Sequence, residues 1–467
     1  MTLAAWTGVA LYALLCIGAG RCMLFLCRLP KEELTHNWAS CYLAGQLVIL
    51  MLTLVTAFVP IPLAPLQLAL AVTVLLAASI YLVRQPRTVG GLLLSGLAAF
   101  LVSGVLFPDV WLVTQYTPLW EWDARSYWFF HGKVVFLDDG VKSAFFADPV
   151  NAWSHRNYPL FMAAQSAWLS IIVGDWNDVT AKAFLWINFA AYLDLFRLVL
   201  RRGCGRWWFW VPVLIVLFDQ ETYSYVSGIA DPHYAAPLLL FMAAWCIPGA
   251  GNPAFMALML AFAANMKNES AVYVILAVSV IAAWYVFRPL LRGRRQDLAA
   301  ALAGKTGPIA LGLVLGFVPW LTWSVYRCVH GIAERDQVMA RLADGHTFFA
   351  NLSGRALPIL AYFAENYAHR RAHLLLAVLI LLVVFRHLRG RETAERRACR
   401  YRYLWVVFLV LNGLVFLPYV VTTWDLGFHL GTSAGRLLLL PFLVLILLLA
   451  EESRRIVSCF TTDIENP

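Results

Sequence analysis

Charged residues are scarce in this sequence. Asp, Glu, Lys and Arg together make up 13% of the 467 residues, whereas hydrophobic residues make up 61%. Soluble globular proteins carry about 25% charged residues, so this composition excludes an ordinary soluble domain. Apolar runs close to the roughly 20 residues that cross a bilayer recur along almost the whole chain. The sequence therefore predicts an all-α polytopic membrane protein.

Several chemical signatures are absent as well. The nine cysteines include no CxxC pair, which argues against a disulfide framework and against a cysteine zinc site. No P-loop, Rossmann glycine pattern or HExxH sequence occurs, which argues against nucleotide hydrolysis and zinc proteolysis. The net charge of +9 does not indicate nucleic acid, because in a membrane protein the basic residues follow the topology.

About thirteen transmembrane spans are predicted from the apolar runs. They lie at 3–27, 38–59, 64–83, 90–113, 179–200, 207–218, 235–248, 253–267, 270–287, 307–328, 373–386, 402–421 and 436–450. The first run is interpreted as a retained span, and the short run 158–173 as a juxtamembrane helix at the interface. With the N-terminus outside, most Lys and Arg of the connecting loops face the cytoplasm, as the positive-inside rule requires.

This topology divides one integral membrane domain into three segments. Residues 1–113 form a four-span segment, 114–178 an extracytoplasmic loop with juxtamembrane helices, and 179–467 the remaining bundle. The polar stretches, including the turn at Lys267, then face outward from the plasma (inner) membrane. Nucleotide sugars are scarce on that side, so a transferase there needs an activated donor that is delivered within the membrane.

The first outer loop contains the acidic stretch "WEWDARSYW", with Glu121, Asp123 and Arg125. Apolar surroundings raise the pKa of a carboxyl group toward the range of a general base, unless a cation such as Arg125 offsets the effect. The alternative is an aromatic belt at the headgroups with Asp123 as a helix N-cap. Further along the loop, "HRNYPLF" supplies His155 and Tyr158 ahead of a proline that can start a helix.

Two later outer stretches also interrupt the hydrophobic sequence with charge. Asp231 lies in "SGIADPHY", and Lys267 and Glu269 lie in "NMKNES", where charges at such depth are costly and usually functional. The alternatives are a solvated loop for Asp231 and a Lys–Glu pair that closes a helix turn.

A third stretch, "HLGTSAGRLLL", offers His429, Ser433 and Arg436. Their spacing of i, i+4 and i+7 places them on one helix face. Such a face suits a lipid phosphate; the alternative is an arginine that reaches to the interface.

The arrangement resembles the GT-C superfamily of integral membrane glycosyltransferases, which includes protein O-mannosyltransferases and the lipid A aminoarabinose transferase. The motifs that carry the resemblance are "EWDARSYW", "HRNYPLF", "KNES" and "HLGTSAGRLLL". Four spans precede the acidic loop, where such families usually have one, so extra N-terminal helices are expected. The resemblance implies a GT-C-like bundle with a polyprenyl-phosphate sugar as donor and a catalytic carboxylate in the first loop, at Asp123 or, as second choice, Glu121.

The expected reaction transfers the sugar to an acceptor hydroxyl of a glycan, lipid or protein, with inversion. In this scheme Lys267, His429 and Arg436 bind the donor phosphate. The residues expected to bind the acceptor or to support the site are Arg125, His155, Tyr158, Asp231 and Glu269. A divalent metal is possible but not required. The competing prediction is a transporter or flippase, in which the same charges line a pathway.

Overall fold

The computed structural model describes residues 1–27, 32–84, 86–204, 224–246, 251–282, 308, 311–332, 341–342, 344–370, 372–388, 395–449 and 451–452. Within these ranges every regular element is a helix, as predicted, and no strand occurs. Six of the described helices are long and apolar enough to cross a membrane, or seven if one bent pair counts as a single span. This is the architecture of a multi-pass membrane protein.

The chain divides into two compact units. The first consists of Met1–Leu198, Glu221–Phe241 and Asn252–Ala333, and the second of Val199–Gln220, Met242–Gly251 and Glu334–Pro467. These boundaries do not coincide with the predicted segments 1–113, 114–178 and 179–467. Because those segments were defined by topology and not by packing, they stay a prediction.

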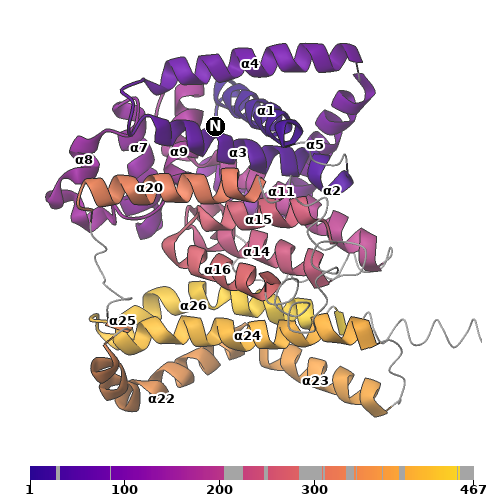
Figure 1. Cartoon of the computed structure of the whole chain (residues 1–467), viewed down its shortest axis with the longest axis vertical. Coiled ribbons are helices and arrows are strands. Elements are labelled where there is room, and N and C mark those ends of the chain that lie inside the picture. The colour runs from indigo at the N-terminus through magenta and orange to yellow at the C-terminus, as the bar shows by residue number, and fades with distance from the viewer. Residues whose placement is uncertain are drawn as a thin grey trace, which may run out of the picture. The chain divides into compact units, whose positions relative to one another are not determined.

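The described helices from the N-terminus to the end of the first unit are shown in Figure 1. They are α1 (Leu3–Leu26), α2 (Glu33–His36), α3 (Trp38–Val55), α4 (Leu63–Arg84), α5 (Pro86–Leu106), α6 (Pro108–Tyr116), η1 (Ala124–Trp128), α7 (Phe129–Leu137), α8 (Ser143–Ala147), η2 (Pro149–Ser154), α9 (Phe161–Val173), α10 (Asp178–Ala181), α11 (Ala183–Cys204), α13 (Ser224–Ser227), α14 (Asp231–Cys246), α15 (Pro253–Ala264), α16 (Asn268–Ala282), η5 (Leu313–Phe317) and α20 (Val318–Val329).

Two glycines let α1 and α3 approach until their backbones touch. A Cβ on Gly20 would lie 1.8 Å from the carbonyl oxygen of Cys41, and a Cβ on Gly45 would lie 1.8 Å from that of Cys16. Each helix therefore carries a Cys-x-x-x-Gly pair that fits against the pair of the other helix. Small residues at a four-residue spacing permit this close packing in a membrane, where apolar helices gain little by leaving lipid.

The predicted span 90–113 is wrong as a single straight helix. The chain bends by 100° between Gly90–Leu106 and Pro108–Tyr116. Pro108 cannot continue the helix of α5, since it lacks an N–H group, and it disfavours helical angles at Phe107, whose φ of -130° and ψ of 63° are not helical. Pro108 instead starts α6, which leads toward the acidic stretch.

The helix α9, predicted to lie at the membrane interface, is enclosed by other helices. Its residues from Phe161 to Ser170 are buried, and it contacts α1, α3 and α7. The helix is therefore packed inside the protein, and its predicted place at the interface or partway into the membrane stays a prediction. At 13 residues, α9 is about 20 Å long, which is shorter than the hydrocarbon core.

Other predicted spans are also short in the structure. The helix α15 has 12 residues and α16 has 15 described residues, and neither qualifies as a complete span. The predicted span 207–218 lies outside the described residues. The predicted outer loop 329–372 contains a 25-residue helix, α22 (Gly345–His369), although it is not apolar enough to count as a span. The total of thirteen spans therefore stays a prediction.

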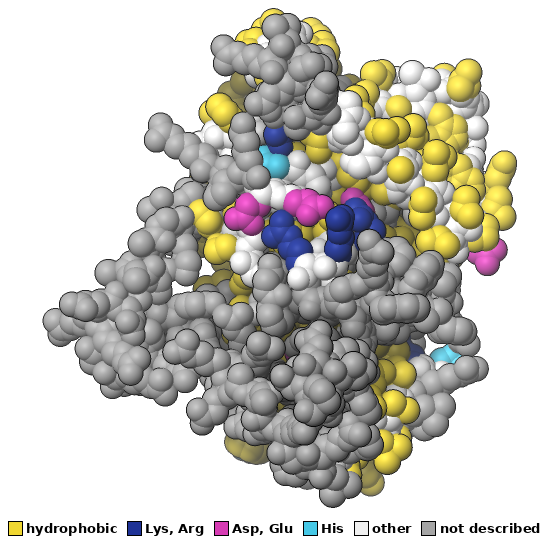
Figure 2. All heavy atoms as spheres, turned by 90° about the vertical axis from the view of Figure 1, so that its right-hand side faces the viewer, with side chains coloured by type: hydrophobic (Ala, Val, Ile, Leu, Met, Phe, Trp, Pro, Cys, Tyr) yellow, Lys and Arg dark blue, Asp and Glu magenta, His cyan; other side chains and the backbone are white. Residues whose placement is uncertain are grey.

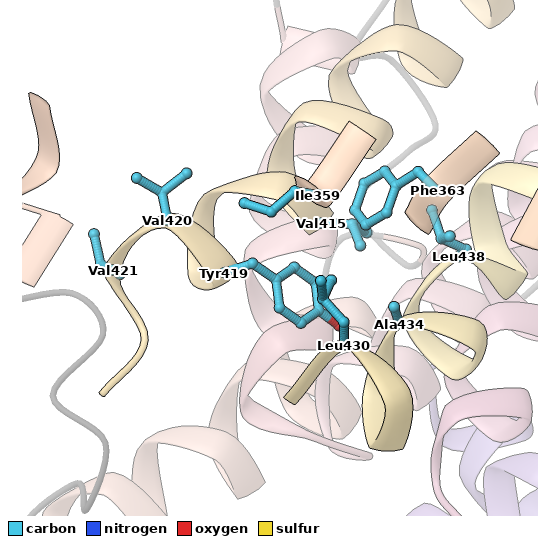
Figure 3. Close-up of a cluster of buried hydrophobic side chains, with 9 residues drawn as sticks. All are labelled: Ile359, Phe363, Val415, Tyr419, Val420, Val421, Leu430, Ala434 and Leu438. Atoms are coloured by element: carbon cyan, nitrogen blue, oxygen red, sulfur yellow. The ribbon is translucent and has the colours of Figure 1, made fainter. Parts of the chain in front are cut away.

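The remaining described helices belong to the second unit. They are α22, α23 (Ala372–Leu388), α24 (Glu395–Val421), α25 (Leu426–His429), η6 (Leu430–Ala434) and α26 (Gly435–Leu437). Its core joins α22, α24 and η6, and Figure 3 shows Phe363, Val415 and Leu438 pointing toward one another there. Arg355 of α22 completes this core by donating hydrogen bonds to three carbonyl groups at the end of α24, those of Tyr419, Val420 and Thr422.

The outside of α4 and α5 is strongly apolar. Leu68, Leu75 and Leu94 are each exposed by about two thirds of their surface. Figure 2 shows one face of the molecule, on which hydrophobic side chains cover a wide area while charged side chains gather in one narrow band. A soluble protein rarely exposes so continuous an apolar surface, and contact with lipid accounts for it.

We expect replacement of Gly45 by Leu to disrupt the α1–α3 contact, because the new side chain would collide with the backbone at Cys16. The free energy of unfolding should fall by about 1–3 kcal/mol or more. A lower unfolding temperature in detergent micelles would show this loss. Gly91→Ala is the matched control, since nothing lies within 4 Å of a Cβ there. Equal unfolding temperatures for Gly45→Leu and wild type would contradict the role assigned to this contact.

Candidate active site

A buried ion pair lies at the centre of the polar residues of the first unit. Lys267 Nζ lies 3.2 Å from Asp231 Oδ1 and 3.7 Å from Glu269 Oε1. The side chains of Lys267 and Asp231 are 9% and 2% exposed, whereas that of Glu269 is 40% exposed. Tyr234 also donates a hydrogen bond to Asp231 Oδ1, at 3.2 Å. Asp231 is therefore the nearer and more deeply buried counter-ion of Lys267, and Glu269 is the more exposed carboxylate.

The turn that carries Lys267 is built by its own polar residues. Ser270 Oγ donates to the carbonyl oxygens of Ala263 and Lys267, and it accepts a hydrogen bond from the Lys267 N–H. The amide of Asn265 donates to the carbonyl of Gly316, in the π-helix η5, at 3.1 Å. The stretch "NMKNES" thus satisfies its backbone groups locally and orients the ammonium group of Lys267 toward α14.

His155 and Tyr158 connect the first loop to this ion pair. Tyr158 donates a hydrogen bond to Glu269 Oε1 at 3.5 Å, and its ring stacks on His155 with ring centres 5.3 Å apart. The His155 ring lies 4.5 Å from that of Tyr127, which belongs to η1. His155 also has a left-handed backbone, with a φ of 49°. Such a conformation is uncommon outside glycine and concentrates at functional sites.

Three side chains donate hydrogen bonds to one backbone carbonyl in the loop around Tyr158. The oxygen of Asn157 accepts hydrogen bonds from Arg327 Nη1 at 2.9 Å, Trp323 Nε1 at 3.4 Å and Asn268 Nδ2 at 3.5 Å. Arg327 and Trp323 are four residues apart on α20, so they lie on the same helix face. This contact gives Arg327, an arginine within a predicted span, a positioning role.

The acidic stretch folds into a π-helix, η1, that leads into α7. The N–H of Phe129 donates to the carbonyl of Ala124, five residues earlier. Asp123 already has helical backbone angles, and its side chain makes no capping hydrogen bond at η1. The alternative in which Asp123 caps the helix is therefore wrong. Short π-helices are frequent at functional sites, because the widened turn displaces side chains from their regular positions.

A glycine brings the acidic stretch and the Asp231 stretch together. Gly228 has a φ of +96°, and a Cβ there would lie 2.7 Å from the Cβ of Ala124 and 3.1 Å from Phe129 Cε2. The chain therefore packs its backbone directly against η1, three residues before Asp231. Two outer stretches that are far apart in the sequence meet at this point.

The predicted site residues thus fall into two groups. In the first unit, the structure brings together His155, Tyr158, Asp231, Lys267 and Glu269, and the stretch with Asp123 reaches them through Tyr127. Glu121 and Asp123 are half-buried and Arg125 is exposed. The second group, His429 and Arg436, belongs to the second unit and is described by itself.

The predicted turn 422–435 is mostly helical. His429 Nδ1 lies 2.8 Å from Thr422 Oγ1, and Ser433 Oγ lies 2.8 Å from the hydroxyl of Tyr419. Residues 430–434 form a π-helix, so the stretch that holds His429, Ser433 and Arg436 is helical but not a regular α-helix. A π-turn holds more residues than an α-turn, which shifts their relative directions. Arg436 is half-buried.

Two buried residues near the site carried no pattern that the sequence analysis used. His131 on α7 is 1% exposed, and its Nε2 lies 3.2 Å from Ser154 Oγ. Lys182, between α10 and α11, is also fully buried, and its Nζ lies over the ring of Trp120. A lysine within an otherwise apolar run was the only signal that could have indicated Lys182.

A metal site finds no support in the part of the chain that the structure describes. No group of three or more His, Cys, Asp and Glu side chains there has an arrangement that could hold a metal ion. The carboxylates of Asp231 and Glu269 both lie against the ammonium group of Lys267.

Comparisons with protein-family models, with curated proteins and with solved structures give no match to this chain. Its class therefore rests on the helices themselves, which are those of an all-helical, multi-pass membrane protein.

Removal of the two carboxylates should have different effects on stability. Asp231→Asn leaves the buried ammonium group without its nearest counter-ion, which costs about 3–5 kcal/mol. Glu269→Gln removes a longer, partly exposed contact and should cost less than about 1 kcal/mol. Unfolding temperatures in detergent test this, and the double variant Asp231→Asn with Lys267→Met should recover most of the loss. Equal losses for the two single variants would refute the assigned roles.

Stability should also fall in acid because of His131. Burial, followed by the charge of His155, lowers the pKa of His131 to about 3 from 6.5. The unfolded chain therefore takes up the proton first, and the stabilisation present above about pH 6.5 is lost as the pH falls toward about 3. We expect His131→Gln to have a flatter dependence of unfolding temperature on pH in this window. An unchanged slope would show that other groups control the acid sensitivity.

Proposed function

We propose that this protein is a membrane glycosyltransferase that transfers a sugar from a polyprenyl-phosphate donor to an acceptor hydroxyl on the extracytoplasmic face of the plasma (inner) membrane. The observation that carries the proposal is the ion pair of Lys267 and Asp231, with Glu269, Tyr158 and His155 linking it to the π-helix next to Asp123. The GT-C resemblance supplies the type of reaction. The contacts supply a set of side chains suited to it.

Lys267 is the cation proposed to bind the donor phosphate. A lysine between two carboxylates forms a group with a net charge of -1, which by itself would repel a phosphate. Asp231 is held by Lys267 and Tyr234, but the contact with Glu269 is 0.5 Å longer and reaches a half-exposed side chain. A phosphate oxygen can therefore replace Glu269 on Lys267, while Tyr158 keeps its hydrogen bond to Glu269.

Asp123 is the proposed general base, with Glu121 as second choice. The acceptor oxygen attacks the anomeric carbon, its proton passes to the carboxylate of Asp123, and the bond between that carbon and the phosphate oxygen breaks. The electron pair of this bond stays on the departing polyprenyl phosphate, whose growing charge Lys267 stabilises. Attack opposite the leaving group inverts the anomeric centre. Positioned proton transfer contributes roughly 10²- to 10⁴-fold to such a rate.

The other predicted residues have lesser roles. His155, with its left-handed backbone between Tyr127 and Tyr158, is proposed to bind the acceptor, as is the exposed Arg125. His429 and Arg436 stay predicted phosphate ligands, but they lie in the second unit and the proposal does not depend on them.

A transporter or flippase is the second candidate, and a specific observation favours it. Inside the first unit, Tyr12 donates to Gln165 at 2.6 Å, and Gln46 donates to Tyr12 and Tyr42 at 3.3 and 3.1 Å. These four side chains are fully buried. Connected polar groups within a helical bundle also occur along transport pathways. The bend between α5 and α6 is a further feature that transporters share.

Asp123→Asn tests the proposed reaction. We expect cells that carry only this variant to lose one sugar of an envelope glycan by at least about 10²-fold and to accumulate the lipid-linked donor, because the base is missing. Mass spectrometry of glycans and of polyprenyl-phosphate sugars in deletion cells, complemented at equal protein levels, measures both and identifies the sugar.

Glu33→Gln, a change in α2 outside the candidate site, serves as the control and should match wild type. Normal glycans with Asp123→Asn, against a loss in the deletion, would exclude Asp123 as the base. Normal glycans and donor pools in the deletion itself would refute the transferase and favour transport.

A further inference from the structure

Lys182 is a buried lysine that the proposed mechanism leaves unused. It follows α10 directly, and its side chain is fully buried. Its Nζ donates a hydrogen bond to the carbonyl of Val113 at 3.1 Å and lies 4.9 Å from the ring centre of Trp120. Both contacts belong to the segment that leads into the acidic stretch.

The ammonium group of Lys182 lies within the electrostatic influence of Asp178 but makes no direct contact with a carboxylate of the described residues. It forms no ion pair with any of the residues that the structure describes. The acid closest to it in the sequence, Asp178, instead accepts a hydrogen bond from Trp176 Nε1 at 2.9 Å. An ammonium group that makes no direct ion pair is costly inside a protein, and still more so within a membrane bundle. Stability alone therefore does not explain a lysine at this position.

The two contacts of Lys182 hold both ends of a short connection. Val113 lies in the last turn of α6, where the negative end of the helix dipole favours a cation. Trp120 lies directly before Glu121, and its ring face attracts the ammonium group. Between them, residues 117–120 are not helical. Lys182 thus determines the distance and direction from the end of α6 to the acidic stretch.

From these contacts we infer that Lys182 is the positioning residue for Glu121 and Asp123. This inference rests on the proposed function, because Asp123 is the general base in that proposal and the contacts of Lys182 are taken to place it. Lys182 forms no ion pair with either carboxylate. It acts on their position through its contacts with Trp120 and α6.

Methionine is the informative replacement. It has nearly the length and flexibility of lysine but neither the charge nor the hydrogen-bond donor. The carbonyl of Val113 would remain satisfied in Lys182→Met, since it also accepts a hydrogen bond from the Thr117 N–H at 3.2 Å. Removal of a buried charge that makes no direct ion pair also removes the cost of its desolvation. A purely structural lysine and a positioning lysine therefore predict different results.

The experiment compares wild type with Lys182→Met, Lys182→Arg and Lys133→Met, where Lys133 is an exposed control on α7. Each full-length variant is purified in detergent for unfolding temperature and for hydrogen–deuterium exchange of residues 117–128. Each is also expressed in deletion cells for the glycan measurement, next to Asp123→Asn.

We expect Lys182→Met to keep or raise the unfolding temperature, to speed exchange only in residues 117–128, and to lower glycan transfer by roughly 10²-fold. Lys182→Arg, which retains the charge and the donor, should restore transfer. A lower unfolding temperature with faster exchange throughout the first unit would overturn the inference, as would unchanged exchange and transfer. If Asp123→Asn has no effect while Lys182→Met speeds local exchange, the proposed reaction fails but the positioning of the acidic stretch stands.

Discussion

The ammonium group of Lys267 is the constraint around which the candidate site is organised. A charge inside a membrane bundle must be paired, and the chain pairs this one with Asp231 from another helix. That pairing dictates the rest: Tyr234 fixes Asp231, Ser270 shapes the turn of Lys267, and Asn265 joins the same turn to η5. Glu269 and Tyr158 then extend the network toward the first loop.

Close backbone contacts provide the rigid frame for this network. Gly20 and Gly45 bring α1 and α3 together, and Gly228 brings the Asp231 stretch against η1. Each contact is available only to a residue without a Cβ. Because van der Waals packing replaces much of the hydrophobic driving force between helices in lipid, such contacts determine which helices become neighbours. The charged residues are then positioned with little freedom.

The sequence predicted the parts of the fold that depend on local composition. The helices α1, α3 and α4 follow long uninterrupted apolar runs, and their observed bounds lie close to the predicted ones. The break before Pro108 was missed, although the proline was visible, because apart from Asp109 the surrounding residues are apolar. The sequence analysis singled out Lys267 as a costly charge and named Glu269 as its alternative partner, but the nearer acid, Asp231, is brought to it by tertiary contacts of α14.

The less predictable features arise from tertiary contacts. No local pattern separates a π-helix from an α-helix over residues 124–128, and the close approach of Gly228 to Ala124 is likewise a tertiary contact. Lys182 was overlooked because its partners, Val113 and Trp120, lie about 60 residues earlier in the chain. The role of Asp123 as a base remains a proposal, whereas its exclusion as an N-cap follows directly from its backbone.

The π-helix η1 has an evolutionary consequence. A single π-turn accommodates one residue more than the α-helix around it, so it marks a place where the chain can gain or lose a residue without breaking the helix. Loss of that residue would restore regular α-helical geometry but rotate everything before it by about 100° relative to α7. Asp123 would then point in a different direction. Related chains with and without this extra residue would share their helices while presenting different side chains at the same place.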